Sequence, residues 1–487
     1  MPIKLEQLHL NDASRSIEGL EETKAVPTDK QICDDVVLLW RQEPATEDLG
    51  LVELLEKVVH RNPSWDLSES KLKQTLIDHN LSFSDESKLF TYADQVVSAQ
   101  CPFIDPKSLE KLELLETQPR GWSAFARKDL RRDEIIFYEH EALTPILPLD
   151  KTSLAEIGRS CSLCGTLLTQ SSQFTMKNLL DCQFCSAVWC SKHCKRLEAA
   201  THSFLKHPTS KSKQVSATGW LDFEKMCKEN AMHAAYSIGI IYARIILDKH
   251  DSDRIREQFE SLAQVSQTLR TKSADSTNIG GTFDRAMGAV SSEDRSLWSN
   301  VFESFCSAFP NVEEEEGLNL ETFLTYIGKF NINQLDGQIY TIYSHLNHKC
   351  EPNVRYEVDG KKGLKVFARK DIKKGEELFT TYVNPLHGVT LRRRELLVNW
   401  GFLCNCSRCH KELAARNKAG STFGPKLDLP GIKVTRRKSS LKASKPDLSE
   451  LLKNGQEFDL EVPDDLEFGR RRKSVRFDDR VMAAVEE

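Results

Sequence analysis

The stretch Asn347-His348-Lys349-Cys350-Glu351-Pro352-Asn353 decides the fold of this chain, because it sets an amide, an imidazole and a thiol side by side. Alone, an Asn-His pair before Cys-x-Pro-Asn is compatible with a turn that buries a cysteine. Four other features acquire meaning beside it, and we interpret the set together. They are Gly121-Trp122-Ser123, Tyr382, the Cys-x-Cys-x-x-Cys cluster of Cys404, Cys406 and Cys409, and the cysteine-rich block from Cys161 to His207.

The composition is typical of a soluble chain with several domains. The chain has 487 residues, 39% apolar and 29% charged, which predicts two to four globular domains. The net charge of −5 excludes a basic nucleic-acid binder as a whole, so any such contact must be local. The longest apolar stretch, Ala231 to Leu247, contains His233 and Arg244, and we expect a buried helix there and no membrane segment.

The 14 cysteines indicate metal binding rather than disulfides. The start, Met1-Pro2-Ile3-Lys4-Leu5-Glu6, lacks the apolar core of a signal peptide. In a reducing compartment, Cys-x-x-Cys-like spacing means a metal site more often than a disulfide.

The cysteine-rich block offers eight candidate ligands, which fill two tetrahedral zinc sites with no remainder. Because no ligand position stays open for water, we expect structural zinc, and we expect the two sites to interleave. Other histidines nearby offer alternatives to His207. The expected ligands are Cys161, Cys164, Cys190 and Cys194 on one ion, and Cys182, Cys185, His202 and His207 on the other.

The N-terminal part divides into three pieces. Residues 1–27 are polar and expected to be disordered. Residues 28–80 predict a helical subdomain of three amphipathic helices, the first opened by a capping box at Thr28-Asp29-Lys30-Gln31 and the second starting at Thr46. We interpret it as a docking or capping subdomain, with nucleic-acid binding as the alternative. Residues 81–117 predict a connector.

The middle of the chain mixes strands and helices. Residues 121–130 and 134–138 predict a turn and two short strands, and residues 359–363 predict a hairpin turn between the strands 354–358 and 364–368. Residues 218–329 predict a helical region that contains a polar loop from Thr271 to Gly281. A short basic helix is expected at 391–397, and beyond Leu413 the charge blocks predict a disordered tail, 414–487.

The opening motif, Tyr382 and the Cys404 cluster together resemble the SET domain of protein lysine methyltransferases, and the Cys161–His207 block resembles a MYND zinc finger. The arrangement is similar to the SET-and-MYND family, and within it to the fungal methyltransferases of the fourth core histone. The resemblance runs from the first helix to Phe402 and into the tail. It implies an α+β fold: a β-rich, split SET domain over 118–401, a finger inserted at 161–207, a helical insert at 218–329 and a post-SET zinc segment at 402–413.

The resemblance also implies S-adenosylmethionine as methyl donor and a lysine ε-amine as acceptor. By position, Tyr382 is the catalytic tyrosine. Cys350 joins Cys404, Cys406 and Cys409 on a third zinc, which agrees with the four ligands that zinc prefers. The alternatives are a core tyrosine at 382 and a packed free thiol at 350. The implied cofactor-binding residues are Arg120, Gly121, Trp122, Asn347, His348, Tyr382 and Phe402.

Two features depart from the family. Its Gly-x-Gly turn is Gly121-Trp122-Ser123 here, and Ser123 would be strained if that position required positive φ. The C-terminal helical-repeat domain of animal SET-and-MYND enzymes has no counterpart in the chain, so the substrate cannot be copied from those relatives.

The tail and the substrate leave several expectations open. Lys473-Ser474-Val475-Arg476-Phe477 resembles the docking peptide of the type-one protein phosphatase, and its basic residues could instead contact DNA nonspecifically or direct nuclear import. We expect a histone or nucleosome substrate, no membrane partner, and a nuclear protein with a cytoplasmic pool. The alternatives are a non-histone lysine methyltransferase and a chromatin adaptor that recruits partners through the finger and tail.

Overall fold

The computed structural model describes residues 24–79, 81, 89–118, 120–169, 172–207, 212–276, 295–312, 317–358 and 363–418. Expectations for the remaining residues, including the docking peptide at Lys473–Phe477 and the hairpin turn itself, lie outside the described residues. The segment 1–27 was predicted to be disordered, but its last residues are ordered. Ala25 donates a backbone hydrogen bond to the Ser64 carbonyl at 2.8 Å.

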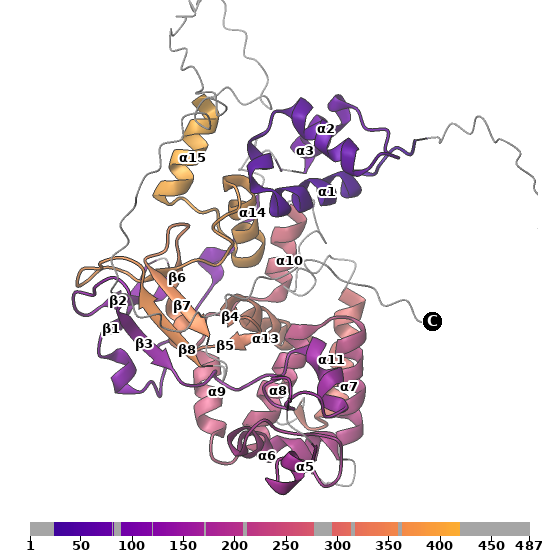
Figure 1. Ribbon diagram of the computed structural model, residues 1–487, viewed down its shortest axis with the longest axis vertical. Coiled ribbons are helices and arrows are strands. Elements are labelled where there is room, and N and C mark those ends of the chain that lie inside the picture. The colour runs from indigo at the N-terminus through magenta and orange to yellow at the C-terminus, as the bar shows by residue number, and fades with distance from the viewer. Residues whose placement is uncertain are drawn as a thin grey trace, which may run out of the picture. The chain divides into compact units, whose positions relative to one another are not determined.

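Three helices, α1 (Asp29–Gln42), α2 (Leu51–Arg61) and α3 (Glu69–Asp78), pack around a shared apolar core near the N-terminus (Figure 1). The capping box is confirmed, since Gln31 N–H donates to the Thr28 hydroxyl and Thr28 N–H donates to the Gln31 side chain. The second helix was predicted to start too early, because Pro44–Asp48 forms a separate 3₁₀ turn (η1).

Within the described residues, the strands form four small sheets beside the helices (Figure 1). One pairs β1 (Leu112–Thr117) with β2 (Gly121–Ala126), and another has the order β3-β8-β7, with β3 at Ile135–Glu139, β7 at Val354–Val358 and β8 at Leu364–Ala368. The predicted hairpin strands are confirmed as antiparallel. Two short pairs complete the set: β4 (Gln334–Leu335) with β5 (Gln338–Ile339), and β6 (Asn347–His348) with β9 (Phe379–Thr380).

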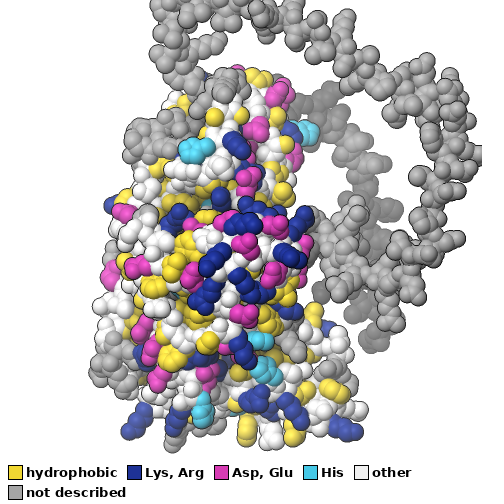
Figure 2. All heavy atoms as spheres, turned by 90° about the vertical axis from the view of Figure 1, so that its left-hand side faces the viewer, with side chains coloured by type: hydrophobic (Ala, Val, Ile, Leu, Met, Phe, Trp, Pro, Cys, Tyr) yellow, Lys and Arg dark blue, Asp and Glu magenta, His cyan; other side chains and the backbone are white. Residues whose placement is uncertain are grey.

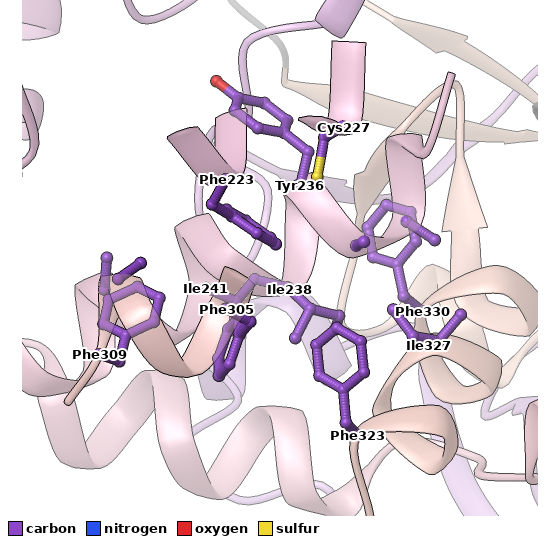
Figure 3. Close-up of a cluster of buried hydrophobic side chains, with 14 of the residues drawn as sticks. Phe223, Cys227, Tyr236, Ile238, Ile241, Phe305, Phe309, Phe323, Ile327 and Phe330 are labelled. Atoms are coloured by element: carbon purple, nitrogen blue, oxygen red, sulfur yellow. The ribbon is translucent and has the colours of Figure 1, made fainter. Parts of the chain in front are cut away.

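A helical layer follows in the lower half of Figure 1, and aromatic side chains fill its centre. Figure 3 shows side chains of α7, α8, α11 and α13 converging there, and Phe305 lies with ring centroids 4.8 Å from Phe309 and 5.1 Å from Phe323. The predicted buried helix at 231–247 is α8, and no described helix is long and apolar enough to cross a membrane. The described helices between residues 152 and 333 are α4 (Thr152–Glu156), α5 (Ser172–Lys177), α6 (Lys192–Lys206), α7 (Ala217–Glu229), α8 (His233–Leu247), α9 (Ser252–Ser261), α10 (Gln267–Ser276), α11 (Arg295–Ala308) and α13 (Leu320–Asn333).

Helix α14 (Val389–Trp400) connects the N-terminal helices with the cysteine cluster at Cys404. At its N-terminus, Glu47 accepts hydrogen bonds from the backbone of Thr390 at 2.6 Å and Leu391 at 3.3 Å. Arg394 donates to the His79 carbonyl at 3.2 Å, and Arg393 donates to the Cys404 carbonyl at 3.2 Å. The basic helix predicted there is therefore confirmed, but its arginines are buried and donate hydrogen bonds to residues outside the helix.

Three further predictions need correction. The expected connector contains a strand, β1, which pairs along its full length with β2. The polar loop expected from Thr271 is helical as far as Ser276, because its polar side chains are buried against α14, as when Ser273 donates to the Leu397 carbonyl at 3.1 Å. Helix α15 (Ser407–Lys418) continues past Leu413, where the tail was predicted to begin.

The strand side of the molecule carries charges of both signs. Figure 2 shows Lys and Arg side chains interspersed with Asp and Glu side chains on this face. Ion pairs join Lys111 to Glu134 at 2.7 Å and Lys373 to Asp129 at 3.1 Å. The face therefore does not present a field of one sign to nucleic-acid phosphates.

Candidate active site

A cavity of about 850 Å³ lies between β2, β6 and the C-terminal end of α14. Its size falls in the range of small-molecule and cofactor sites. It brings together the predicted residues Arg120, Trp122, Asn347, His348, Tyr382 and Phe402, whereas Gly121 lies beside the lining and not in it. The lining also includes Thr91, Ala93, Asp94, Val96, Ser98, Asn333, His345, Lys349, Trp400 and Cys406.

A second cavity, of about 660 Å³, lies between β4, β7 and the start of α8, and Tyr382 is also part of its lining. The two cavities share lining residues, with Tyr382 and Trp400 among them. The ring centroids of these two residues are 5.0 Å apart. Tyr382 therefore stands where a molecule in one cavity could meet a molecule in the other.

Asn347 is held by its pairing in β6 and by its side chain. β6 runs parallel to β9, and the Asn347 amide nitrogen donates to the Ser123 hydroxyl and to the Glu377 carboxylate, each at 2.8 Å. Glu377 in turn pairs with Arg120 at 2.9 Å. These contacts join the two parts of the chain that flank the cysteine-rich block and the helical layer.

The condition under which Ser123 would be strained is not met, because Ser123 is not among the residues with positive φ. Gly121, at the start of β2, has the positive φ of 71°, and Ser123 lies in the same strand fully buried, outside the positive-φ region. A Cβ at Gly121 would lie 2.7 Å from the Ser98 hydroxyl oxygen, so this position requires glycine for both conformation and space. The Ser123 hydroxyl accepts the hydrogen bond from the Asn347 amide, and a glycine at this position would lack that acceptor.

The His348 imidazole lies between the tyrosine and the third cysteine cluster. Its Nδ1 accepts a hydrogen bond from the Tyr382 backbone at 3.0 Å, and its Nε2 lies 3.4 Å from the Cys350 sulfur. The Tyr382 hydroxyl donates to the Leu346 carbonyl at 2.9 Å. Burial raises the pKa of Tyr382 above its usual value, so the hydroxyl stays protonated and can orient a neighbouring group.

Three groups of cysteine and histidine have the donor sets and spacing of tetrahedral zinc sites. Zinc–sulfur bonds of about 2.3 Å place sulfurs about 3.8 Å apart. The sulfur–sulfur separations in the structure are close to this value: 3.7 Å for Cys164–Cys190, 3.5 Å for Cys190–Cys194 and 3.8 Å for Cys350–Cys404. In the mixed group, Cys182 and Cys185 sulfurs lie 3.5 and 3.4 Å from the Nε2 atoms of His207 and His202.

The grouping agrees with the sequence-based pairing of ligands. The three groups are Cys161, Cys164, Cys190 and Cys194; Cys182, Cys185, His202 and His207; and Cys350, Cys404, Cys406 and Cys409. Within each group the ligand atoms all lie within 4.8 Å of one another. Cys350 therefore lies with the cluster, as the resemblance implied.

Sequence reasoning missed several cavity residues. Thr91, Asp94 and Ser98 come from the predicted connector, whose irregular pattern gave no signal for a binding wall. His345 was also missed; it is buried at the cavity, and burial lowers its pKa to about 4. Only the proximity of His345 to the Asn347 motif could have drawn attention to it.

The geometry agrees with comparisons to known proteins. The SET domain profile matches residues 121–383. The chain is 45% identical to "Histone-lysine N-methyltransferase SET5" of Candida glabrata and 44% identical to the protein of that name from Eremothecium gossypii, in each case over 100% of this chain and 99% of the relative. The chain therefore belongs to the SET-domain family, together with the fungal proteins named SET5. A structure titled "Crystal structure of the SET domain of LSMT bound to Lysine and AdoHcy" aligns at 13% identity over 62% of this chain and 54% of the other, with a TM-score of 0.30, too low to add to the assignment.

Proposed function

We propose that the chain is an S-adenosylmethionine-dependent histone-lysine N-methyltransferase. Family membership supports the reaction class, and the observation that carries the proposal is the position of Tyr382 between two cavities. A methyl donor and a lysine bound from opposite sides would meet at this residue. Histones are the substrates that the names of the relatives suggest. The fourth core histone is the one we propose first, because the sequence resemblance implies it.

The larger cavity is assigned to the cofactor. Its residues fit an adenosyl amino acid: Phe402 and Trp400 offer aromatic faces, and Arg120 and Lys349 offer positive charge toward a carboxylate. The glycine at 121 allows the strand to pass close to the cavity wall. When bound, S-adenosylmethionine supplies an electrophilic methyl group on a sulfonium. Asn347 and His348 hold the wall on which it would rest, by backbone and side chain.

The smaller cavity is assigned to the substrate lysine. Methyl transfer is an in-line displacement, so the residues of the chain contribute mainly by positioning the two reactants. With a pKa of about 10.4, roughly one lysine in 2,500 is neutral at pH 7, and only the neutral amine can attack. The aromatic walls formed by Tyr382, Trp400 and Tyr356 favour the neutral amine, because they desolvate the charged form. The protonated Tyr382 hydroxyl then orients the amine.

The metal groups are assigned structural roles. The two groups between Cys161 and His207 form a MYND-type finger with two zinc ions, and the group around Cys350 forms a post-SET zinc site. The donor sets are complete at four ligands, which leaves no position for a substrate. In the third site, zinc fixes Cys350 and hence the contact of His348 with Tyr382.

The remaining expectations follow from this assignment. The split SET domain at 118–401, with its finger at 161–207, its helical insert at 218–329 and its post-SET segment at 402–413, is the domain organisation we propose. A histone substrate implies a nuclear, chromatin-associated protein. The cytoplasmic pool, the phosphatase peptide and the DNA contact remain predictions for separate tests.

The test is methyl transfer to purified histones. The full chain, incubated with methyl-labelled S-adenosylmethionine and either core histones or nucleosomes, should label a histone, and mass spectrometry should map the label to lysine. A parallel reaction with a cell extract tests other substrates: cofactor binding together with labelling of a non-histone protein, but of no histone, would support a methyltransferase of different substrate. Absence of both cofactor binding and transfer would contradict the proposal.

A further inference from the structure

Residues 89–98, here called the strap, lie outside the matched SET region at 121–383 and yet form part of the large cavity. One end of the strap is fixed to the turn after α14. The backbone amides of Tyr92 and Ala93 donate to the Gly401 carbonyl at 3.0 and 3.3 Å. The fully buried Tyr92 ring also donates through its hydroxyl to the Val398 carbonyl at 3.2 Å.

The other end of the strap is fixed beside β2. Val97 exchanges backbone hydrogen bonds with Gln264, at 3.3 and 2.8 Å. The Ser98 hydroxyl accepts from the Trp122 backbone at 3.4 Å. The strap therefore crosses from the Gly401–Phe402 side of the cavity to the Trp122 side, and both of its ends are held by long-range contacts.

The strap brings a carboxylate to the cavity. Among the described lining residues, Asp94 is the only acidic one, whereas Arg120 and Lys349 are basic. The basic residues already have neighbours: Arg120 pairs with Glu377, and the Lys349 ammonium lies 5.0 Å from the centre of the Phe379 ring. For Asp94, the described part of the chain supplies neither a hydrogen bond nor an ion pair to the side chain. The exposed carboxylate is thus available to a bound molecule.

The position of Asp94 indicates which part of a ligand it would meet. It follows Ala93, whose amide is bonded to Gly401, and Gly401 precedes Phe402, an aromatic side chain that also lines the cavity. An aromatic face suits a nucleobase, and carboxylates beside nucleoside sites accept hydrogen bonds from ribose hydroxyls. The amino-acid part of the cofactor would then lie toward the basic residues.

We propose that the strap is a wall of the cofactor cavity and that the Asp94 carboxylate accepts a hydrogen bond from the ribose of the bound cofactor. This inference rests on the proposed function, because it assigns the cavity to an adenosyl ligand. It extends the binding site to a segment that the SET match does not include.

Calorimetric titration of the full chain tests the inference without relying on activity. The probes are S-adenosylhomocysteine, which carries nucleoside and amino acid, and methylthioadenosine, which carries the nucleoside without the amino acid. Asp94→Asn should weaken the binding of both by about tenfold, since it exchanges a charged acceptor for a neutral amide. The control Asp253→Asn alters an exposed acid on α9, away from the cavity, and should leave both affinities unchanged.

The outcomes separate this inference from the proposed function. Unchanged affinities in Asp94→Asn would overturn the role of Asp94 while the methyltransferase assignment stands. Loss confined to S-adenosylhomocysteine would overturn the ribose contact, because it would place Asp94 at the amino-acid part. If the wild-type chain bound neither probe, the cofactor assignment itself would fail.

Discussion

Replacing Gly401 by alanine should destabilise the strap and weaken cofactor binding in the large cavity. Gly401 ends α14 in the left-handed region, with φ of 78°. A Cβ at this position would lie 2.5 Å from the Tyr92 ring, so the buried ring would have to move. Such a move would break the bonds of the Tyr92 and Ala93 amides to Gly401.

A matched control separates the cost of the left-handed backbone conformation from the cost of displacing the Tyr92 ring. Gly375 has a similar φ of 81°, but a Cβ there would meet nothing within 4 Å. Gly375→Ala should therefore cost only the left-handed conformation, about 1–2 kcal/mol in the free energy of unfolding. Gly401→Ala adds the displaced ring and about two or three hydrogen bonds worth about 1 kcal/mol each, for about 3–5 kcal/mol in total.

The assay is urea unfolding of both variants together with calorimetric titration by S-adenosylhomocysteine. Gly401→Ala should be the less stable variant by at least about 2 kcal/mol and should bind the ligand at least about tenfold more weakly, whereas Gly375→Ala should bind it normally. Equal losses of stability and equal affinities in the two variants would refute the role assigned to the strap.

Two further predictions follow from the site. Cys350→Ser should lower the zinc content from three ions per chain to two, as measured by mass spectrometry of the metal. It should also weaken S-adenosylhomocysteine binding, because His348 contacts both Cys350 and Tyr382. A zinc content of three ions in the variant would contradict the third site. Burial lowers the pKa of His345 to about 4, below the 6.5 of an unfolded histidine, so its contribution to stability is complete above pH 6.5 and is lost as pH falls toward 4. Wild-type stability should thus fall by up to about 3 kcal/mol more than that of His345→Gln over this range, and parallel pH profiles in urea unfolding would argue against it.

Features set by local chemistry were predictable from the sequence. The grouping of the eight candidate ligands in the cysteine-rich block followed from ligand count and spacing, and the structure brings the same residues together. The Thr28 capping box and the hairpin strands depend on neighbouring residues, so their patterns carried enough information. The Asn347 motif was linked to the Cys404 cluster and to Tyr382 through the family resemblance.

Features held by distant partners were not predictable in the same way. β1 shows no regular alternation, since its burial follows the pairing with β2 and not its own sequence. The basic run in α14 suggested a charged helix, yet Arg392 and Arg394 are fully buried and bonded to Glu412 and His79. The strap lacks any periodic pattern. Its position depends instead on hydrogen bonds to Gly401, Val398 and Gln264, which lie elsewhere in the chain.

The central claim is that Tyr382 acts where the cofactor and substrate cavities meet, and one variant tests it most directly. Tyr382→Phe keeps the ring beside Trp400 and removes only the hydroxyl that donates to Leu346. Methyl transfer to core histones should fall at least about a hundredfold, as expected when a positioned catalytic group is removed, while S-adenosylhomocysteine affinity stays within about twofold of wild type. Transfer at the wild-type rate would contradict the claim.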